Sequence, residues 1–568
     1  MSGKIIKISG PLVVAEGLIS DAAIAGIVRV GSQRLLGEVL RLTRDSAAIQ
    51  VFEDTRGLSA GDEVIAESGE KLSVELGPGL LGNIFDGIQR PLKELRKLAG
   101  DTIRQGITSP AIDRKRRWEF VPNVSPGDNV MVGDILGAVE EAEGFFHQIM
   151  VPPDVSGVIR RADFGTFTIE ESVCQIETPE GELVDVTMLQ KWPIRTARRV
   201  LRKFSPEMPL RTGLRVIDTL FPIAYGGSAA VPGAFGSGKT VALQELAKRA
   251  EADVTICICC GERSNEMADF LAQFQEASAG RMVMICNTSD MPIAAREAAV
   301  YSGVTIAEYY RDMGYNVLIL ADSTTRWAEG LREISNRLGE SPGDEGYPAY
   351  LPARIAEFYE RAGSVECVGG RSGSLTIVGA VSPPGGDLSE PVTQAAMRVV
   401  NTFWKLDEFL ANRRHFPAVD WLTSYSHYTE PLKPWYDSNF GAEFLANRDK
   451  AMKILRRDDE VSQIAGELSP EDQLTLETAK MIREDFLRQD ADSHSTYEEQ
   501  ATLLSLILYY NDICTDALQK GVTDLRELFE IPSRERIGKT ARIEEYRAIA
   551  NDMEREIDAL IAEGGQET

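Results

Sequence analysis

A glycine-rich stretch at residues 233–240 carries the residue types that bind a nucleoside triphosphate. It reads GAFGSGKT and fits the pattern G-x-x-x-x-G-K-[ST]. The glycines let backbone N–H groups point at phosphate oxygens, Lys239 supplies a positive charge, and the Thr240 hydroxyl can bind Mg²⁺. A helix-forming stretch at 241–250 follows and would turn its positive end toward the phosphates. The predicted nucleotide-binding residues are Gly233, Ala234, Phe235, Gly236, Ser237, Gly238, Lys239 and Thr240.

A carboxylate at the end of an apolar run is the second expected part of such a site. Asp322 directly follows the run 317–321. At that place in a nucleotide-binding sheet, a carboxylate holds the ligand shell of Mg²⁺. The alternative is that Asp322 only caps the helix that follows it. The loop at 233–240 favours the metal role.

A third candidate follows the apolar run 254–260, where Glu262 and Arg263 stand next to each other. Ligands of open parallel sheets bind at the carboxyl ends of the strands. A carboxylate there can orient the attacking water, and an arginine can reach a phosphate or the charge that develops on it. Spacing alone leaves a surface ion pair between the two residues as an equal alternative.

The pattern of apolar runs divides the chain into several domains. Short alternating runs predict a β-barrel over 1–72, and the connection 73–110 leads through the glycine-punctuated stretch 81–92 into a short helix. Turn signals between short strands indicate a β-rich inserted domain over 111–188. Over 189–436 strands alternate with helices, which predicts a parallel, doubly wound α/β domain around the phosphate loop.

The last part of the chain, 437–568, loses its strand signals and is predicted to be a helical domain. Near the end, apolar residues recur at three- and four-residue steps, as one stripe of a helix does. The stripe consists of Ile543, Tyr546, Ile549, Met553, Ile557 and Leu560.

Composition excludes several classes of protein. The formal net charge of −26 argues against a nucleic-acid binder, which needs a basic surface. The seven cysteines and four histidines show no metal-ligand spacing, and the cysteines within 257–260 are interpreted as small buried residues of a strand. No apolar run approaches the length of about 18 residues that a membrane helix needs. We therefore expect a cytoplasmic chain without a secretory signal.

Long stretches of the sequence resemble the catalytic A subunit of the V-type and archaeal A-type rotary ATPases. The matching motifs run from about residue 81 to 426. They include LGNIFDGIQRPL, HQIMVPP, MLQKWPIRTARRV, RTGLRVIDTLFPIAYGGSAAVPGAFGSGKT, CGERSNEM, ADSTTRWAEGLREIS, SPPGGDLSEPVTQ and RRHFPAVDWLTSYS. The resemblance implies a barrel, an inserted β domain, a RecA-like nucleotide-binding domain and a helical C-terminal domain.

The resemblance also implies roles for single residues. Glu262 falls on the family's catalytic glutamate, Arg263 on its phosphate-side arginine, and Phe416 on the aromatic residue that packs against adenine; without the resemblance, Phe416 is interpreted as an ordinary core residue. Two positions depart from the pattern. Ser264 replaces a glycine, which restricts the loop after Arg263, and Ser237 stands where vacuolar members carry a redox-sensitive cysteine.

The implied activity is Mg²⁺-dependent hydrolysis or synthesis of ATP, coupled to the transport of H⁺ or Na⁺ across a membrane. The implied partners are B subunits, which alternate with A subunits in a hexamer and supply an arginine finger, central and peripheral stalk subunits, and a membrane ion-translocating sector. The chain is then expected on the cytoplasmic side of the membrane. The same residues serve both directions of the reaction, and the transported ion is chosen in other subunits.

Three other classes share parts of these features. A ring-shaped nucleic-acid translocase would need a basic channel, against which the net charge weighs. A flagellar or secretion-export ATPase would not account for the β-rich insert. A nucleotide-binding structural subunit, like the family's B chain, would not need Lys239, Glu262 and Asp322 together.

Overall fold

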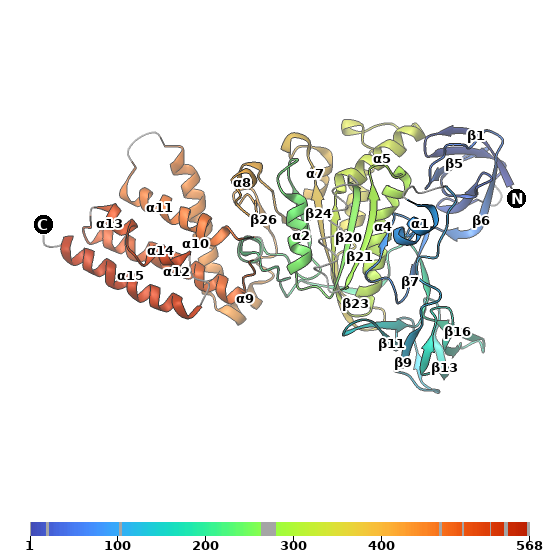
Figure 1. The fold of residues 1–568 in the computed structure, drawn as a ribbon, viewed down its shortest axis with the longest axis horizontal. Helices are drawn as coiled ribbons and strands as arrows, with labels where there is room; N and C mark the ends of the chain where they lie inside the picture. Colours follow the sequence, from blue (N-terminus) through green and yellow to red (C-terminus); the bar gives the residue numbers. More distant parts are fainter. Residues whose placement is uncertain are drawn as a thin grey trace. The chain divides into compact units, whose positions relative to one another are not determined.

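The chain folds into two compact units. The computed structural model describes residues 2–18, 22–100, 105–262, 280–464, 468–490, 493–522, 524–538 and 543–564. The first unit comprises 1–205, 225–232 and 252–400, and the second comprises 206–224, 233–251 and 401–568. Figure 1 colours the chain from its N-terminus in blue to its C-terminus in red.

The first unit begins with a closed six-stranded barrel, as the alternating pattern predicts. The strands follow one another around the barrel in the order β1-β2-β5-β4-β3-β6. Their inward side chains, among them Val13, Val28, Val39 and Ile49, are fully buried. Closure leaves no free strand edge. The strands are β1 (Ser2–Ser9), β2 (Leu12–Glu16), β3 (Gly26–Val30), β4 (Leu35–Leu42), β5 (Ser46–Val51) and β6 (Glu63–Lys71).

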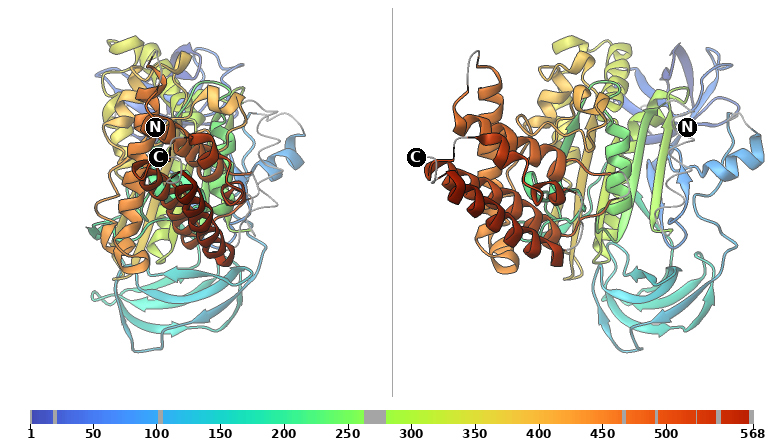
Figure 2. Two further views of the ribbon diagram at one scale, coloured as in Figure 1. Left: turned by 90° about the vertical axis from the view of Figure 1, so that its left-hand side faces the viewer. Right: turned by 60° about the vertical axis from the view of Figure 1, so that its left-hand side comes forward.

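The β-rich insert consists of two four-stranded sheets, seen together in Figure 2. One sheet contains β10 (Asn129–Val130), β13 (Gly157–Ala162), β15 (Ser172–Glu177) and β16 (Leu183–Thr187). The other contains β12 (Phe145–Met150), β11 (Ile135–Ala142), β9 (Trp118–Pro122) and β14 (Gly165–Phe167). The chain enters and leaves the insert beside a pair of antiparallel strands, β7 (Ser73–Leu76) and β17 (Gln190–Pro193).

A parallel sheet forms the centre of the first unit. Its strands lie in the order β19 (Ser228–Pro232), β24 (Ser372–Val381), β22 (Asn316–Asp322), β20 (Val254–Glu262), β21 (Met282–Thr288) and β8 (Ile84–Phe85). The predicted apolar runs 254–260 and 317–321 form β20 and β22. Like these two strands, β21 and β24 are almost completely buried, as is expected of a parallel sheet covered on both faces. The connection supplies the predicted helix α1 (Leu92–Ala99) and also the strand β8, which is not predicted.

Two further strands and several helices complete the first unit. Antiparallel β23 (Gly363–Cys367) pairs with β24 and with β18 (Val200–Phe204). The helices are α4 (Ile293–Asp312), α5 (Thr324–Leu338), α6 (Leu351–Tyr359) and α7 (Pro391–Met397), with short turns at η2 (Asp344–Gly346) and η3 (Pro384–Gly386).

Helix α4 is buried along nearly its whole length, and it packs on β20, β21, β22 and α5. Its buried acidic residues are therefore paired with arginines. Arg195 donates to both carboxylate oxygens of Glu297 in α4, at 2.9 and 2.7 Å, and to both oxygens of Glu38 in the barrel, at 2.8 Å each. This bidentate contact joins the barrel to the start of α4.

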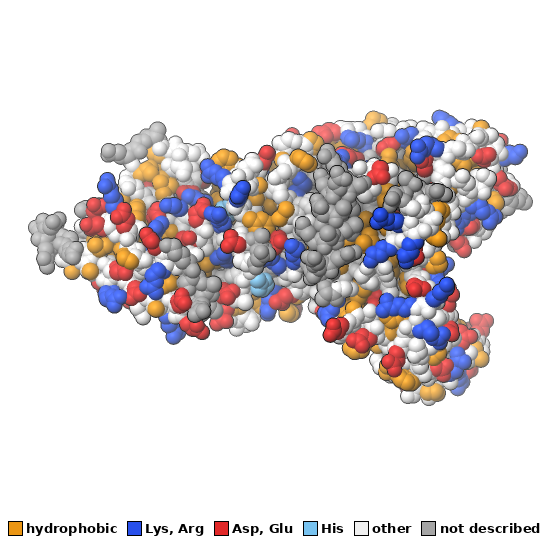
Figure 3. All heavy atoms as spheres, in the orientation of Figure 1, with side chains coloured by type: hydrophobic (Ala, Val, Ile, Leu, Met, Phe, Trp, Pro, Cys, Tyr) orange, Lys and Arg blue, Asp and Glu red, His pale blue; other side chains and the backbone are white. Residues whose placement is uncertain are grey.

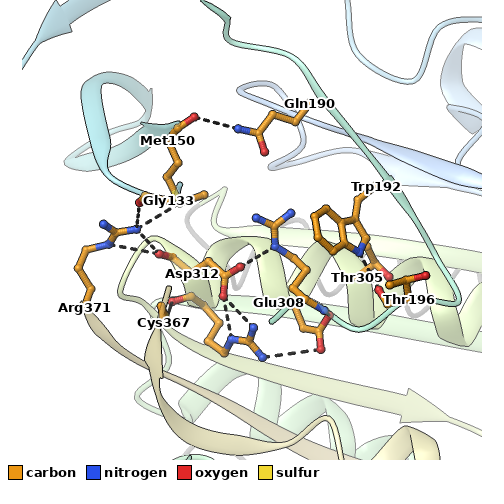
Figure 4. A network of polar contacts seen from close by, with 12 residues as sticks. Gly133, Met150, Gln190, Trp192, Thr196, Thr305, Glu308, Asp312, Cys367 and Arg371 are labelled. Carbon is orange, nitrogen blue, oxygen red and sulfur yellow. Dashed lines mark hydrogen bonds and ion pairs between the residues drawn. The ribbon is translucent and has the colours of Figure 1, made fainter. Parts of the chain in front are cut away.

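The other end of α4 carries a second polar network, shown in Figure 4. Arg371 donates from one Nη2 atom to the Asp312 carbonyl oxygen at 2.7 Å and to the Gly133 carbonyl oxygen of the insert at 2.8 Å. Arg198 donates to the Asp312 carboxylate at 2.5 Å. Buried His147 of the insert contacts the Tyr309 hydroxyl at 2.9 Å. The insert is thus fastened to the C-terminal end of α4.

The second unit is mostly helical and includes the predicted C-terminal helical domain. In α15 the stripe residues Tyr546, Ile549, Met553 and Ile557 are buried and Leu560 is half-buried, while the Ile543 side chain lies outside the described residues. The elements are η1 (Val216–Leu220), α2 (Lys239–Arg249), β25 (Thr402–Phe403), α8 (Glu408–Asn412), β26 (Tyr425–Ser426), α9 (Lys433–Phe440), α10 (Glu443–Ser462), α11 (Pro470–Met481), η4 (Ile482–Leu487), α12 (Tyr497–Gln519), α13 (Leu525–Phe529), α14 (Arg534–Ile537) and α15 (Ile543–Gly564).

A buried carboxylate ties the helical part of the second unit to the segment that precedes the phosphate loop. Asp218 in η1 accepts hydrogen bonds from Thr212 N and Oγ1, at 2.9 and 2.7 Å, and from Gly213 N at 2.9 Å. It also accepts one from Gln500 Nε2 of α12 at 3.1 Å. Four donors therefore satisfy one fully buried carboxylate.

The helices and the surface of the described part of the chain were compared with what membrane spans and charged binding surfaces require. None of the helices that the structure describes has the length and hydropathy of a membrane span. On the face drawn in Figure 3, acidic and basic side chains are interspersed among the described residues. The predicted fold class is confirmed, whereas the residue limits of its domains remain predictions.

Candidate nucleotide-binding site

The predicted phosphate loop joins β19 to α2. Gly236 and Gly238 adopt φ values of +84° and +86°, in the left-handed region that favours glycine. Gly233 has no room for a side chain, because a Cβ atom there would collide with Ser237 Oγ. Glycine is thus favoured by the backbone conformation at 236 and 238 and by the nearby Ser237 side chain at 233, and Lys239 begins α2 directly after the loop.

Two side chains of the loop hold its backbone from within. The Ser237 hydroxyl is fully buried and donates to the Ala234 carbonyl at 2.8 Å. Lys239 Nζ donates to the carbonyl oxygens of Gly233 and Ala234, at 2.7 and 2.8 Å. Phe235 is 84% exposed at the tip, and Thr240 is half-buried. The ammonium group of Lys239 therefore lies against the loop backbone. When a nucleotide binds, this group can donate to phosphate oxygens in place of the two carbonyl oxygens.

The two predicted carboxylates lie at one edge of the parallel sheet. Asp322 ends β22 and is 5% exposed, and Glu262 ends the neighbouring strand β20 and is half-buried. Cys259 is paired in register with Asp322. β19 runs parallel to these strands in the same sheet, so it also ends at this edge, where the chain enters the loop.

The helix after β22 is capped by a residue other than Asp322. Ser323 is the N-cap of α5, and its hydroxyl accepts from the Arg326 N–H at 3.4 Å. Capping of this helix was the alternative role for Asp322, and the neighbouring residue Ser323 performs it instead. Asp322 and Thr240 both carry the hard oxygen donors that Mg²⁺ prefers, so these residues fit the metal. Within the described ranges, no group of three or more His, Cys, Asp or Glu residues could hold a metal ion on its own.

The pKa of the buried Cys260 thiol depends on the charged groups at this edge of the sheet. Burial raises the pKa of Cys260 to about 12, Arg296 lowers it, and Glu262 and Asp322 raise it further. Both carboxylates and Arg296 therefore act on one atom. All seven cysteines are buried and free, which agrees with the interpretation of residues 257–260 as small strand residues.

The sequence did not predict that two arginines, Arg326 and Arg296, lie beside the residue that precedes Glu262. Gly261, at φ +73°, forms part of a register irregularity that redirects the chain at Glu262. A Cβ atom on Gly261 would lie 3.1 Å from Arg326 Cβ and 3.3 Å from Arg296 Nε. Arg326 stands four residues after Asp322 at the start of α5, a position that could have signalled it. Arg296 comes from α4, which no local motif links to Glu262.

Phe416, Arg263 and Ser264 are the remaining residues that the sequence analysis singled out. Phe416 belongs to the second unit, is half-buried, and its carbonyl oxygen accepts from Gln489 N at 2.7 Å. Its adenine-packing role stays a prediction. Arg263 and Ser264 lie outside the described residues.

Family comparisons agree with this architecture. Models of the ATP synthase alpha/beta family match the beta-barrel domain at residues 5–67, the barrel-sandwich domain at 109–195 and the nucleotide-binding domain at 213–426. The C-terminal domain of V and A type ATP synthases matches residues 433–528. The sheet, the loop and these four matches define a nucleotide-binding chain of the ATP synthase alpha/beta class.

Comparison with individual relatives identifies the branch of this class to which the chain belongs. The V-type ATP synthase alpha chain of Acetivibrio thermocellus is 51% identical, with 99% of each chain covered. The A subunit of the A-type ATP synthase of Methanopyrus kandleri is 53% identical, with 92% of this chain and 91% of the relative covered. The chain belongs to the family of V/A-type ATP synthase alpha chains and is a catalytic subunit of such an enzyme. The resemblance found in its motifs is confirmed.

A solved structure shares the fold. The ATPase EscN of the type III secretion system of enteropathogenic E. coli aligns with a TM-score of 0.66 at 22% identity, over 89% of this chain and all of that one. At this identity the likeness concerns the fold alone.

Proposed function

We propose that this chain hydrolyses and forms Mg²⁺-ATP at the loop 233–240, with Glu262 as the working carboxylate. The observation that carries the proposal is the common edge of the parallel sheet. There β22 ends in Asp322, β20 ends in Glu262, and β19 leads into the loop. In open parallel sheets this edge is where ligands bind.

The reaction that these residues support is in-line attack of water on the terminal phosphate. Glu262 orients the water, because a half-buried carboxylate can accept its hydrogen bond while the strand end fixes its direction. Lys239 neutralises charge on the phosphates, and Arg263 assists it. Thr240 and Asp322 would hold Mg²⁺, which supplies further charge neutralisation. Catalysis then depends mainly on position and electrostatics.

The different surroundings of the two carboxylates suit different roles. Asp322 is almost completely buried at the end of a buried strand, which suits a metal-binding group. Glu262 follows a glycine in the left-handed region and is more exposed, so it can meet solvent-derived water. Ser323 takes the capping role in place of Asp322.

The site is completed by other chains in this proposal. B subunits alternate with this chain in a hexamer and supply an arginine finger at the γ-phosphate. Stalk subunits and a membrane sector on the cytoplasmic side convert hydrolysis or synthesis into H⁺ or Na⁺ transport. The isolated chain should therefore bind Mg²⁺-ATP and turn it over slowly, because arginine fingers contribute about 10³- to 10⁵-fold in rate.

The test compares the isolated chain with the purified complex that contains it. ATP hydrolysis is measured in both with Mg²⁺ and again after chelation with EDTA. We expect slow turnover in the isolated chain, fast turnover in the complex, and loss of both on chelation. Equal rates in the two preparations would contradict a shared site, and turnover that persists in EDTA would contradict the metal role.

A further inference from the structure

Arg296, in the first turn of α4, lies against the peptide that carries Glu262. Its Nε atom is 3.3 Å from the place where a Cβ atom on Gly261 would stand. Its backbone carbonyl oxygen lies 4.0 Å from Cys260 Sγ. Both the backbone and the side chain of Arg296 thus meet the last residues of β20.

The side chain of Arg296 also reaches Glu262 through Ser289. Nη2 of Arg296 donates to the Ser289 carbonyl oxygen at 3.2 Å. The Ser289 N–H in turn donates to the Glu262 carbonyl oxygen at 2.9 Å. The loop after β21 is therefore held between Arg296 on one side and the backbone of Glu262 on the other.

One donor of Arg296 is not used. Its Nε–H is buried and makes no hydrogen bond within the described ranges. Buried donors in native proteins are normally paired, so an unpaired one needs a reason. This donor lies beside the turn at Gly261, directly before the carboxylate that the proposed mechanism uses.

The position of Arg296 is fixed by its neighbours on α4. The adjacent residue Glu297 makes a bidentate ion pair with Arg195. Arg195 also forms an ion pair with Glu38 of the barrel. The far end of the helix is held by Arg371 and Arg198 at Asp312 (Figure 4). A buried helix held at both ends gives Arg296 a constant position against Glu262.

We propose that Arg296 is a positioning residue for the Glu262 carboxylate. The guanidinium group holds Ser289 with one N–H and keeps a second N–H at the Gly261 turn, so that the strand end aims Glu262 at the attacking water. A planar fork can serve both directions at once, whereas an ammonium group can serve only one well. This inference rests on the proposed role of Glu262.

The experiment is a double-mutant cycle in the assembled complex. ATP turnover, the KM for ATP and Mg²⁺-ATP affinity are measured for Arg296→Gln, Arg296→Lys, Glu262→Gln and the double variant Arg296→Gln/Glu262→Gln. The matched control is Arg202→Gln, which removes an exposed arginine paired with Glu366 in the same unit.

We expect Arg296→Gln to lower kcat by about 100-fold with little change in KM or affinity, because a small displacement of a reacting group has that effect. Arg296→Lys should recover part of the loss. In the Glu262→Gln background, Arg296→Gln should cause no further loss, because both changes act on one step. Arg202→Gln should behave as the unmodified chain.

The inference fails if Arg296→Gln keeps full kcat, or if it lowers kcat by the same factor with and without Glu262. A loss confined to KM would also overturn it. Near-normal turnover of Glu262→Gln would instead overturn the proposed function, which separates the two failures. If Arg296→Gln does not assemble, the same cycle with Arg296→Lys decides, because its milder loss must also vanish without Glu262.

Discussion

Glu262 and Asp322 end neighbouring parallel strands of one sheet, but they stand in different surroundings. Asp322 is 5% exposed at the end of a buried strand with regular pairing, whereas Glu262 follows a backbone irregularity at Gly261 and is half-buried. The strand pairing brings both to the same edge. A fixed carboxylate beside a more exposed one is an arrangement that can separate metal binding from the activation of water.

Replacing Asp322 by Asn should weaken the dependence of hydrolysis on Mg²⁺. An amide oxygen is a neutral and weaker ligand than a carboxylate, so the Mg²⁺ concentration for half-maximal turnover should rise by about 10- to 100-fold. Titration of ATPase activity with Mg²⁺ measures this. Asp344→Asn, an exposed carboxylate of the same unit, is the control. An unchanged Mg²⁺ titration in Asp322→Asn would remove this residue from the metal site.

Replacing Gly233 by Ala should weaken nucleotide binding. The added Cβ atom would collide with Ser237 Oγ and break the hydrogen bond from that hydroxyl to Ala234. Forced overpacking costs about 1–3 kcal/mol, which corresponds to about 5- to 150-fold in affinity if the whole cost falls on binding. Binding of a fluorescent ATP analogue to the isolated chain measures the effect.

Gly330→Ala provides the matched control for that change. A Cβ atom at Gly330 in α5 meets only ordinary contacts, at 3.5 Å from Ile293 Cγ2. Nucleotide affinity should stay the same in this variant. Equal losses in both variants would show that the effect at Gly233 is not local to the loop.

The buried Asp218 carboxyl should make stability depend on pH. Burial raises its pKa from 3.8 to about 6, although hydrogen bonds from Thr212, Gln500 and Gly213 oppose the rise. The folded state therefore binds this proton more tightly than the unfolded state, and the unfolding free energy falls as the pH rises from about 4 to about 6. The difference corresponds to about 3 kcal/mol.

Urea unfolding between pH 4 and 7 tests this pH dependence. Asp218→Asn has no proton to release there, so its unfolding free energy should lack this fall. It should be lower than that of the unmodified chain at pH 7, because the amide cannot accept from Thr212, Gly213 and Gln500 together. The same slope in both proteins would contradict the assignment of the buried proton to Asp218.

Removing the guanidinium group of Arg371 should loosen the attachment of the insert to α4. Arg371→Met loses the hydrogen bonds to the carbonyl oxygens of Asp312 and Gly133, each worth about 1–3 kcal/mol when the donor is charged. Faster amide hydrogen exchange around residue 133 and at the end of α4 is the expected result. Arg160→Met, an exposed residue of the insert paired with Glu177, should leave exchange there unchanged. Unchanged exchange in Arg371→Met would mean that other contacts hold the insert.

Local pattern was enough to predict the strands that carry the candidate site, together with the motif-bearing residues. The apolar runs of β20 and β22 are long. Asp322 follows one run directly and Glu262 follows the other after Gly261, so both carboxylates could be placed at strand ends. The turning glycines of the loop followed from the motif. The barrel and the insert were predictable because short alternating runs with turn residues have few other solutions.

Features that depend on distant parts of the chain could not be predicted. β8 consists of only Ile84 and Phe85, too short to show any period, and it is a strand because β21 offers it an edge. Arg296 lies in a helix pattern and gains its place beside Gly261 only through the packing of α4 on the sheet. The capping role of Ser323 is local, but Asp322 was a candidate for the same role, and only the hydrogen bond from the Arg326 N–H to the Ser323 hydroxyl distinguishes the two residues.

The central claim is that Glu262 performs the chemistry while the loop performs the binding, and Glu262→Gln tests it most directly. In the assembled complex, Mg²⁺-ATP affinity and ATP turnover are measured for this variant beside Glu366→Gln, which changes a partly exposed glutamate paired with Arg202. Loss of a general base lowers turnover by about 10²- to 10⁴-fold, so we expect that loss with Mg²⁺-ATP affinity retained and a normal rate in the control. Near-normal turnover of Glu262→Gln would contradict the account.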